Sequence, residues 1–201
     1  MNWEEKFKGI RDVLGKDVIF PYEVEKVTEL EYGKKEKFLA ERLVTDENIQ
    51  TLLARSCQDK GLILFPGPPK WLNVLQIENL FSLNKGGWQE LHYFAHLDNA
   101  LPGWYAVDRV PSDPQVWSEY VSSLHFNQRI PNAPETIWFL LLYEKIRGKK
   151  IIEDTIQTSS WEDDGWRVCI DTQNNIELFT SPSEAKVSRI SIQEIILLKE
   201  E

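Results

Sequence analysis

The sequence is poor in cysteine and in long apolar runs, two features that would narrow its class at once. Only Cys57 and Cys169 occur, too few for the disulfide framework of a small secreted protein and not spaced as metal ligands. The longest apolar run, Ile137 to Tyr143, has seven residues, whereas a membrane-spanning helix needs about 20. Residues 1–6 do not pair a basic segment with an apolar one, as a signal peptide does. We therefore expect a soluble, cytoplasmic protein.

Motifs of the large enzyme classes are missing as well. There is no Gly-x-Ser-x-Gly nucleophile elbow, and no glycine-rich loop ends in the Gly-Lys-Ser/Thr of a phosphate cradle. Three consecutive acids, Glu162 to Asp164, lack the alternating oxygens and the final glutamate of a calcium loop. Beside Gly165 they are typical of a hairpin turn. The sequence therefore names no catalytic residue and indicates no cofactor.

Negative charge is in excess. The chain has 23 Lys and Arg against 32 Asp and Glu, a formal net charge of −9. Nucleic-acid binding draws most of its energy from cations that meet phosphates, so this charge disfavours it. The short basic clusters at Lys34–Lys37 and Arg147–Lys150 are mixed with glutamates or placed just after an expected helix. Both fit a solvated face better than a nucleic-acid surface.

Helical patterns dominate the first three quarters of the chain. Apolar residues recur at helical spacing from Asn2 to Leu14, and again after a cap at Asp46. Further helices are expected to open near Ser112–Pro114 and to run from Pro134 to Arg147. The last of these is apolar nearly all round and closed by Gly148, so it should be the central buried helix.

A period of two replaces the helical period in the last quarter. Residues 150–180 alternate apolar and polar side chains around two turn signals, Asp163-Asp164-Gly165 and Asn174-Asn175. Residues of these types supply the positive φ angles that hairpin turns need. The pattern therefore predicts a three-stranded antiparallel meander.

Two earlier segments, Leu62–Phe65 and Gly103–Val110, also have strand character, whereas residues 183–201 fit a strand or a helix equally. We therefore predict a single α+β domain over residues 1–201. In it, a helix-rich N-terminal three quarters packs on a small antiparallel sheet built mainly from the C-terminal meander. The expected parts are a charged helical segment (1–60), a mixed helical core (61–148) and the antiparallel meander (149–201).

One cluster has the residue types of a metal or acid–base site: Glu90, His92, His96 and Asp98. His-x-x-x-His places both imidazoles on one face of a helix, as zinc sites often need. Glycines at 86 and 87, and the loop residues that follow from 99 to 103, argue against a helix there. In a strand the two rings would lie about 13 Å apart. We therefore expect no metal site and leave open whether His92 and His96 are more than structural.

Tryptophan is abundant, with eight in 201 residues. Most tryptophans pack in cores, but the residue is also enriched at partner surfaces. With the catalytic motifs missing, this favours a non-catalytic binding or interaction protein that uses an aromatic surface for an unknown protein or small-molecule partner. The residues expected on that surface are Trp71, Trp104, Tyr105 and Arg109. The alternative is an enzyme of unfamiliar type with a site around residues 90–108, formed by His92, His96, Asp98 and Asp108.

Three stretches have a pattern in common with other proteins: Gly103-Trp104-Tyr105 before Pro111, the segment from Ala133 to Gly148, and residues 164–168. Together they resemble a family of uncharacterised proteins from ultra-small, uncultured bacteria of the candidate phyla, over about residues 100–190. In that family a Gly-Trp-Tyr strand precedes a proline, a leucine-rich helix ends at a glycine, and a meander follows. Residues 106–108 depart from the more apolar strand of that family. The resemblance implies kinship and assigns no activity to any residue.

Overall fold

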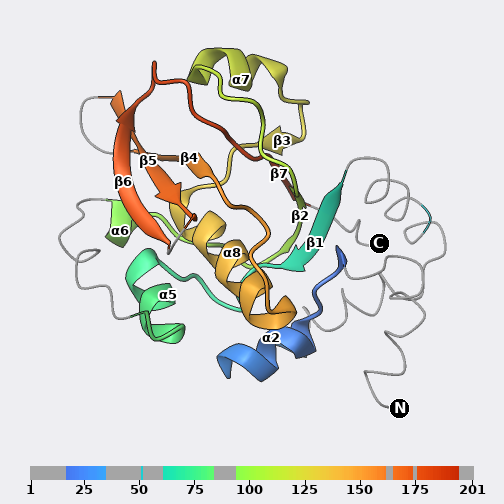
Figure 1. Ribbon diagram of the computed structural model, residues 1–201. Coiled ribbons are helices and arrows are strands. Elements are labelled where there is room, and N and C mark those ends of the chain that lie inside the picture. The colour runs from blue at the N-terminus through green and yellow to red at the C-terminus, as the bar shows by residue number, and fades with distance from the viewer. Residues whose placement is uncertain are drawn as a thin grey trace.

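The described residues form two antiparallel sheets with one long helix between them (Figure 1). The computed structural model describes residues 17–34, 51, 61–83, 94–161, 165–173 and 176–194. The helices are α2 (Pro21–Thr28), α5 (Val74–Leu80), α6 (Phe94–Leu97), α7 (Trp117–Ser123) and α8 (Ala133–Arg147). The strands are β1 (Leu62–Pro66), β2 (Trp104–Asp108), β3 (Gln128–Arg129), β4 (Thr155–Trp161), β5 (Trp166–Asp171), β6 (Glu177–Pro182) and β7 (Ile192–Glu194).

The central helix, α8, forms where the sequence predicts it. Asn132 caps its N-terminus, accepting a hydrogen bond from the Glu135 amide at 2.9 Å, and a proline occupies the first turn. Gly148 ends the helix with φ 69°, a left-handed conformation that glycine adopts without strain. Every residue from Ala133 to Tyr143 is buried. The prediction of a central buried helix is therefore confirmed.

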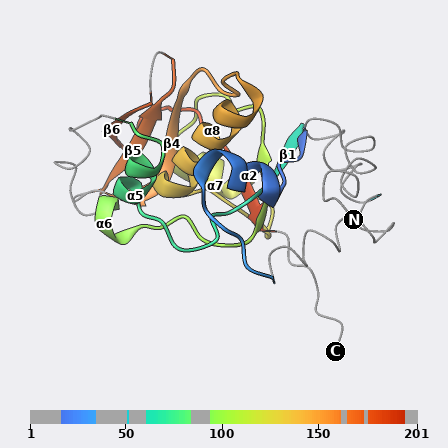
Figure 2. The same ribbon diagram turned by 90° about the horizontal axis from the view of Figure 1, so that it is seen from below.

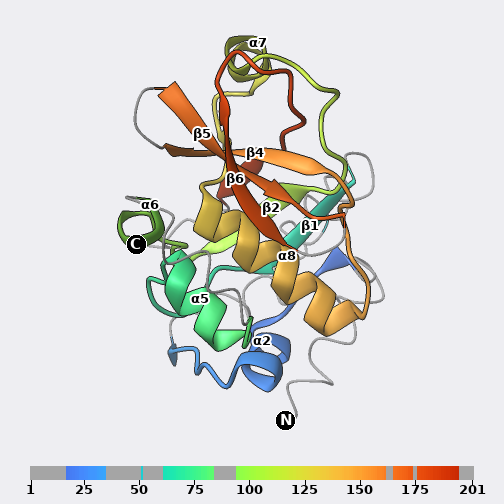
Figure 3. The ribbon, with the colours of Figure 1, turned by 60° about the vertical axis from the view of Figure 1, so that its left-hand side comes forward.

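The two sheets lie on opposite sides of α8 (Figures 1 and 2). On one side Phe139 packs against Phe65 of β1 with ring centroids 5.0 Å apart, and the indole N–H of Trp138 donates to the Pro66 carbonyl oxygen at 3.1 Å. On the other side the helix contacts buried residues of β4 and β5, among them Ile156 and Val168. Helices α2 and α5 also pack against it (Figure 3). One continuous hydrophobic core therefore joins both sheets to α8.

The first sheet has the strand order β1-β2-β7-β3. Strand β7 comes from the far end of the chain and lies between β2 and β3, with Ile192 opposite both Val107 and Arg129. Residues 192–194 therefore answer part of the question that the sequence left open for 183–201, because this stretch is a strand. Residues 195–201 lie outside the described part of the chain.

The predicted meander is confirmed as the second sheet, with strand order β4-β5-β6. Its register pairs Trp161 with Arg167, and Cys169 with Phe179. Residues 156, 168 and 170 face α8, so the intervening positions of β5 face the opposite side of the sheet.

The prediction of a helix-rich N-terminal three quarters is wrong, because strands are distributed along the chain. Strands β1 and β2 lie in that portion and pair with each other from Leu62↔Asp108 to Pro66↔Trp104. They form a sheet of their own with β3 and β7 and do not extend the meander. The strand character expected for Leu62–Phe65 is confirmed, and pairing with the distant β2 places it in this sheet.

Some helix boundaries differ from expectation because backbone groups hydrogen-bond to distant segments of the chain. Helix α7 begins at Trp117 and not near Ser112, because the Ser112 and Gln115 amides donate to carbonyl oxygens of residues 189 and 187. Helix α2 begins at Pro21, and the Glu23 carboxylate accepts a hydrogen bond from the Phe20 amide and closes its first turn. The helices expected over residues 2–14 and after residue 46 lie outside the described residues. Within the described part, no helix has the length and apolarity to cross a bilayer.

Gly67, just after β1, marks a close approach between two backbone segments. A Cβ built there would lie 2.0 Å from the Leu101 carbonyl oxygen and 2.9 Å from a ring carbon of Tyr105. We expect Gly67→Ala to lower the free energy of unfolding by about 2–3 kcal/mol, because the backbone atom cannot move aside as a side chain would. Urea denaturation measures the change.

Gly148→Ala provides the matched control. A Cβ at Gly148 meets nothing within 4 Å, so the substitution costs only the left-handed backbone strain, about 1 kcal/mol. A Gly67→Ala variant no less stable than Gly148→Ala would contradict the close packing of these segments.

Candidate functional site

Two of the residues expected on an aromatic surface are buried. Trp104 and Tyr105 are adjacent on β2, and their side chains are 3% and 2% exposed. Strand β2 lies inside its sheet, between β1 and β7, and both of its faces are covered. Burial raises the pKa of Tyr105, and the charges of Glu135 and Glu194 raise it further. The prediction that these two rings lie on an exposed surface is therefore wrong, because both belong to the core.

The other two expected residues lie at opposite ends of β2. Trp71 is 67% exposed and precedes Leu72, which pairs with Ala100 ahead of the strand. Arg109 follows the strand and forms an ion pair with Asp17. The four residues therefore do not form one surface, and Trp71 alone keeps a largely exposed ring.

The described residues of the His/Asp hypothesis have separate partners. Asp98 accepts a hydrogen bond from the Ser160 hydroxyl, and Asp108 accepts one from the Ser191 hydroxyl. His96 is exposed on α6, and His92 lies outside the described residues. Within the described part of the chain, no three His, Cys, Asp or Glu side chains are placed to hold a metal ion.

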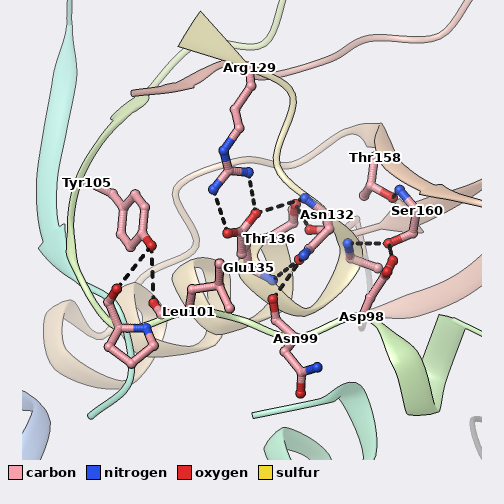
Figure 4. A network of polar contacts seen from close by, with 12 residues as sticks. Asp98, Asn99, Leu101, Tyr105, Arg129, Asn132, Glu135, Thr136, Thr158 and Ser160 are labelled. Atoms are coloured by element: carbon pink, nitrogen blue, oxygen red, sulfur yellow. Dashed lines mark hydrogen bonds and ion pairs between the residues drawn. The ribbon is translucent and has the colours of Figure 1, made fainter. Parts of the chain in front are cut away.

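A polar network surrounds the start of α8 (Figure 4). The buried Glu135 carboxylate accepts two hydrogen bonds from the Arg129 guanidinium, both at 2.6 Å, and one from the Asn132 amide at 3.0 Å. The hydrogen bonds to Glu135 raise the pKa of Arg129. Bidentate pairing of this kind fixes geometry as well as charge.

The same network reaches two further segments (Figure 4). The Asn132 side-chain amide donates to the Asn99 carbonyl oxygen at 2.9 Å, and the Ser160 hydroxyl accepts from the Ala133 amide at 2.8 Å while donating to Asp98. The Asn132 side-chain amide and the Ser160 hydroxyl therefore make their hydrogen bonds to other groups of the protein. The network therefore holds β3, α8 and β4 together, and Ser160 is buried without a histidine partner among its contacts.

A second cluster lies on the face of β4–β5–β6 that points away from α8. We call it the arginine–tryptophan cluster and define it as Trp117, Tyr120, Trp161, Arg167 and Arg189. The guanidinium carbon of Arg167 lies 3.4 Å from the ring centroid of Trp117 and 3.8 Å from that of Trp161. That of Arg189 lies 5.3 Å from Trp117 and 5.9 Å from Tyr120. Both cations are therefore held against aromatic faces, which attract them.

Neutral oxygens are the hydrogen-bond partners of these two arginines. Arg189 donates to the carbonyl oxygens of Gln115 and Val187, at 2.6 and 2.9 Å, and to the Gln157 side chain. Arg167 donates from Nη1 to the Ser159 carbonyl oxygen at 3.1 Å. The Nε atoms of both arginines are buried without a partner. Among the described residues no carboxylate lies within ion-pair distance of either guanidinium.

Burial is the main influence on the electrostatics of the cluster. Burial lowers the pKa of Arg167 to about 10, and the neighbouring positive charge of Arg189 contributes. Burial also lowers the pKa of Arg189. Cys169 faces the same side, and burial raises its pKa to about 11, so its thiol is not a ready nucleophile. The two buried guanidinium groups thus give the cluster a positive charge among the described residues.

Sequence reasoning missed this cluster, although one signal was available. Strands β4 and β5 are neighbours in sequence, and their register places Trp161 opposite Arg167. The contributions of Trp117 and Arg189 come from segments distant in sequence and have no local signal.

Comparisons with known proteins do not assign the chain to a family: no family model, curated protein or solved structure matches it. Kinship with the candidate-phyla proteins therefore stays a prediction. The function must be argued from the geometry of the chain itself.

The polar network at α8 predicts that removing two similar helix caps lowers the free energy of unfolding by different amounts. Asn132 and Asn73 each cap a helix through a reciprocal capping box, but only Asn132 also ties a distant segment, through Asn99. We expect Asn132→Ala to lower the free energy of unfolding by about 2 kcal/mol and Asn73→Ala by about 1 kcal/mol or less. Chemical denaturation of both variants checks the order, and equal costs would contradict the tethering role of Asn132.

Proposed function

We propose that the protein is a non-catalytic binding protein whose partner docks on the arginine–tryptophan cluster. The observation that carries the proposal is the environment of Arg167. Its guanidinium is buried against the indole rings of Trp117 and Trp161, and Trp161 is 57% exposed. Trp, Tyr and Arg are the residue types that dominate binding energy at protein interfaces. The exposed ring of Phe179 lies opposite Cys169, on the same face of the sheet as the cluster, and would widen the contact.

A protein partner fits the proposal better than a small molecule. Small ligands usually bind in enclosed pockets. Within the described residues, the recess beside α8 lined by Leu140, Lys150 and Ile152 shares no residue with the cluster. Exposed rings around a buried cation instead resemble the centre of an interface, where aromatic and arginine anchors are surrounded by weaker contacts.

The enzyme alternative, with a site around residues 90–108, gains no support among the described residues. Asp98 and Asp108 are hydrogen-bonded to different serines in different parts of the fold. An acid–base site needs polar groups that converge on one space, and these do not.

Affinity capture from the native cell lysate with the wild-type chain and with Trp161→Ala tests the proposal. Truncating an anchor ring at an interface typically costs 2 kcal/mol or more, a loss of about 30-fold in affinity. We expect a partner retained by the wild type to be lost, or nearly so, with Trp161→Ala. Circular dichroism and thermal unfolding should first show that the variant is folded.

Trp71→Ala is the matched control, because it removes another exposed indole that is not part of the cluster. We expect this variant to retain the partner. Capture that is the same for the wild type and Trp161→Ala would contradict the proposal, and so would capture that depends only on Trp71.

A further inference from the structure

The arginines of this fold divide into two kinds. Five occur among the described residues, and three of them pair with a carboxylate of the chain: Arg109 with Asp17, Arg129 with Glu135 and Arg147 with Glu23. The other two, Arg167 and Arg189, are the most deeply buried, at 4% and 0% exposure. No described acid compensates either of them.

Burying a guanidinium without an anion is costly, and here two positive charges share one aromatic neighbour. Both lie near the ring of Trp117, so each disfavours the charge of the other. Stacking on aromatic rings and hydrogen bonds to carbonyl oxygens offset only part of the desolvation. Within the described residues, the positive charges of the cluster are therefore not compensated by any carboxylate.

The geometry of Arg167 defines where that charge would bind. Two indole rings lie against the guanidinium, so its N–H groups can reach a ligand only in the guanidinium plane. Nη1 is used by the Ser159 carbonyl oxygen, and Nε is buried without a partner, so a ligand reaches Nε only when the side chains that cover it move aside. The edge that joins Nε and Nη2 carries two parallel N–H groups, the arrangement that matches two oxygens of a carboxylate or a phosphate.

We infer that the arginine–tryptophan cluster is an oxyanion-binding site that receives a carboxylate or phosphate group of the partner on the Nε–Nη2 edge of Arg167. The inference rests on the proposed function and names the chemistry that the partner must bring. The second cation, Arg189, lies 5.3 Å from the Trp117 ring centroid and contributes further positive potential. The aromatic rings exclude water and so strengthen the charge-assisted bonds.

Anion titration of the full chain tests the inference with two probes, sodium phosphate and sodium acetate, each balanced with sodium chloride to constant ionic strength. Thermal unfolding and tryptophan emission are the readouts, since Trp117 and Trp161 contact the site. We expect at least one probe to raise the Tm in a saturable way, by about 3 °C at ten times its Kd, and to change the emission. A response to phosphate alone indicates a phosphorylated partner, and a response to both indicates that an acidic side chain suffices.

Substitutions of Arg167 show whether the anion-dependent increase in Tm arises at this site. Arg167→Met should abolish the Tm increase, and Arg167→Lys, which keeps the charge but loses the paired N–H groups, should weaken binding at least tenfold. Lys149→Met removes an exposed positive charge elsewhere and should leave the response unchanged. If Arg167→Met does not fold, Arg167→Lys alone decides the question.

Two results would overturn the inference. One is a wild-type Tm that is the same in phosphate, acetate and chloride, and the other is an undiminished response in Arg167→Lys. The capture experiment separates this failure from that of the proposed function. Capture that depends on Trp161 without an anion response refutes only the oxyanion site, whereas an anion response without such capture refutes only the docking of a protein partner.

Discussion

Helix α8 has no solvent-facing side between Ala133 and Tyr143, and the rest of the fold is arranged to cover it. A helix that is apolar all round cannot lie on a surface, so neighbours must approach it from every direction. One sheet covers it with Phe65, the other with Ile156 and Val168, and α2 and α5 complete the enclosure. The two sheets belong to one core because both are needed to bury this helix.

The ends of α8 show how the fold handles charge. At its start the buried Glu135 is matched by Arg129, and near its end Arg147 is matched by Glu23 of α2 at 2.7 Å. Breaking either pair would leave a charge in a poorly solvated place, which is why such groups are normally paired. Arg167 and Arg189 depart from this rule within the same chain, and a departure of this kind is expected at a functional site.

The elements that the sequence predicts correctly are those set by residues close to one another in the chain. The start near Pro134 and the stop at Gly148 depend on a few neighbouring residues and place α8 correctly, and the period of two over residues 150–180 places the meander. The burial of Trp104 could not be predicted, because an aromatic strand residue has the same pattern whether a distant strand covers it or not. Only the insertion of β7, from the far end of the chain, makes β2 an interior strand. The arginine–tryptophan cluster depends on similar long-range contacts, so its arginines have no distinguishing local pattern in the sequence.

The central claim, that Arg167 offers an unused pair of N–H groups to an oxyanion, can be observed directly by NMR. Arginine Nε–Hε correlations of the ¹⁵N-labelled chain would be recorded during titration with phosphate and with acetate, and Arg167→Lys would assign the Arg167 signal. One or both anions should move the Arg167 Hε signal to lower field, as a charge-assisted hydrogen bond forms. The signal of Arg129, already paired with Glu135, should stay in place. An Arg167 signal that is the same at every concentration of both anions would contradict the account.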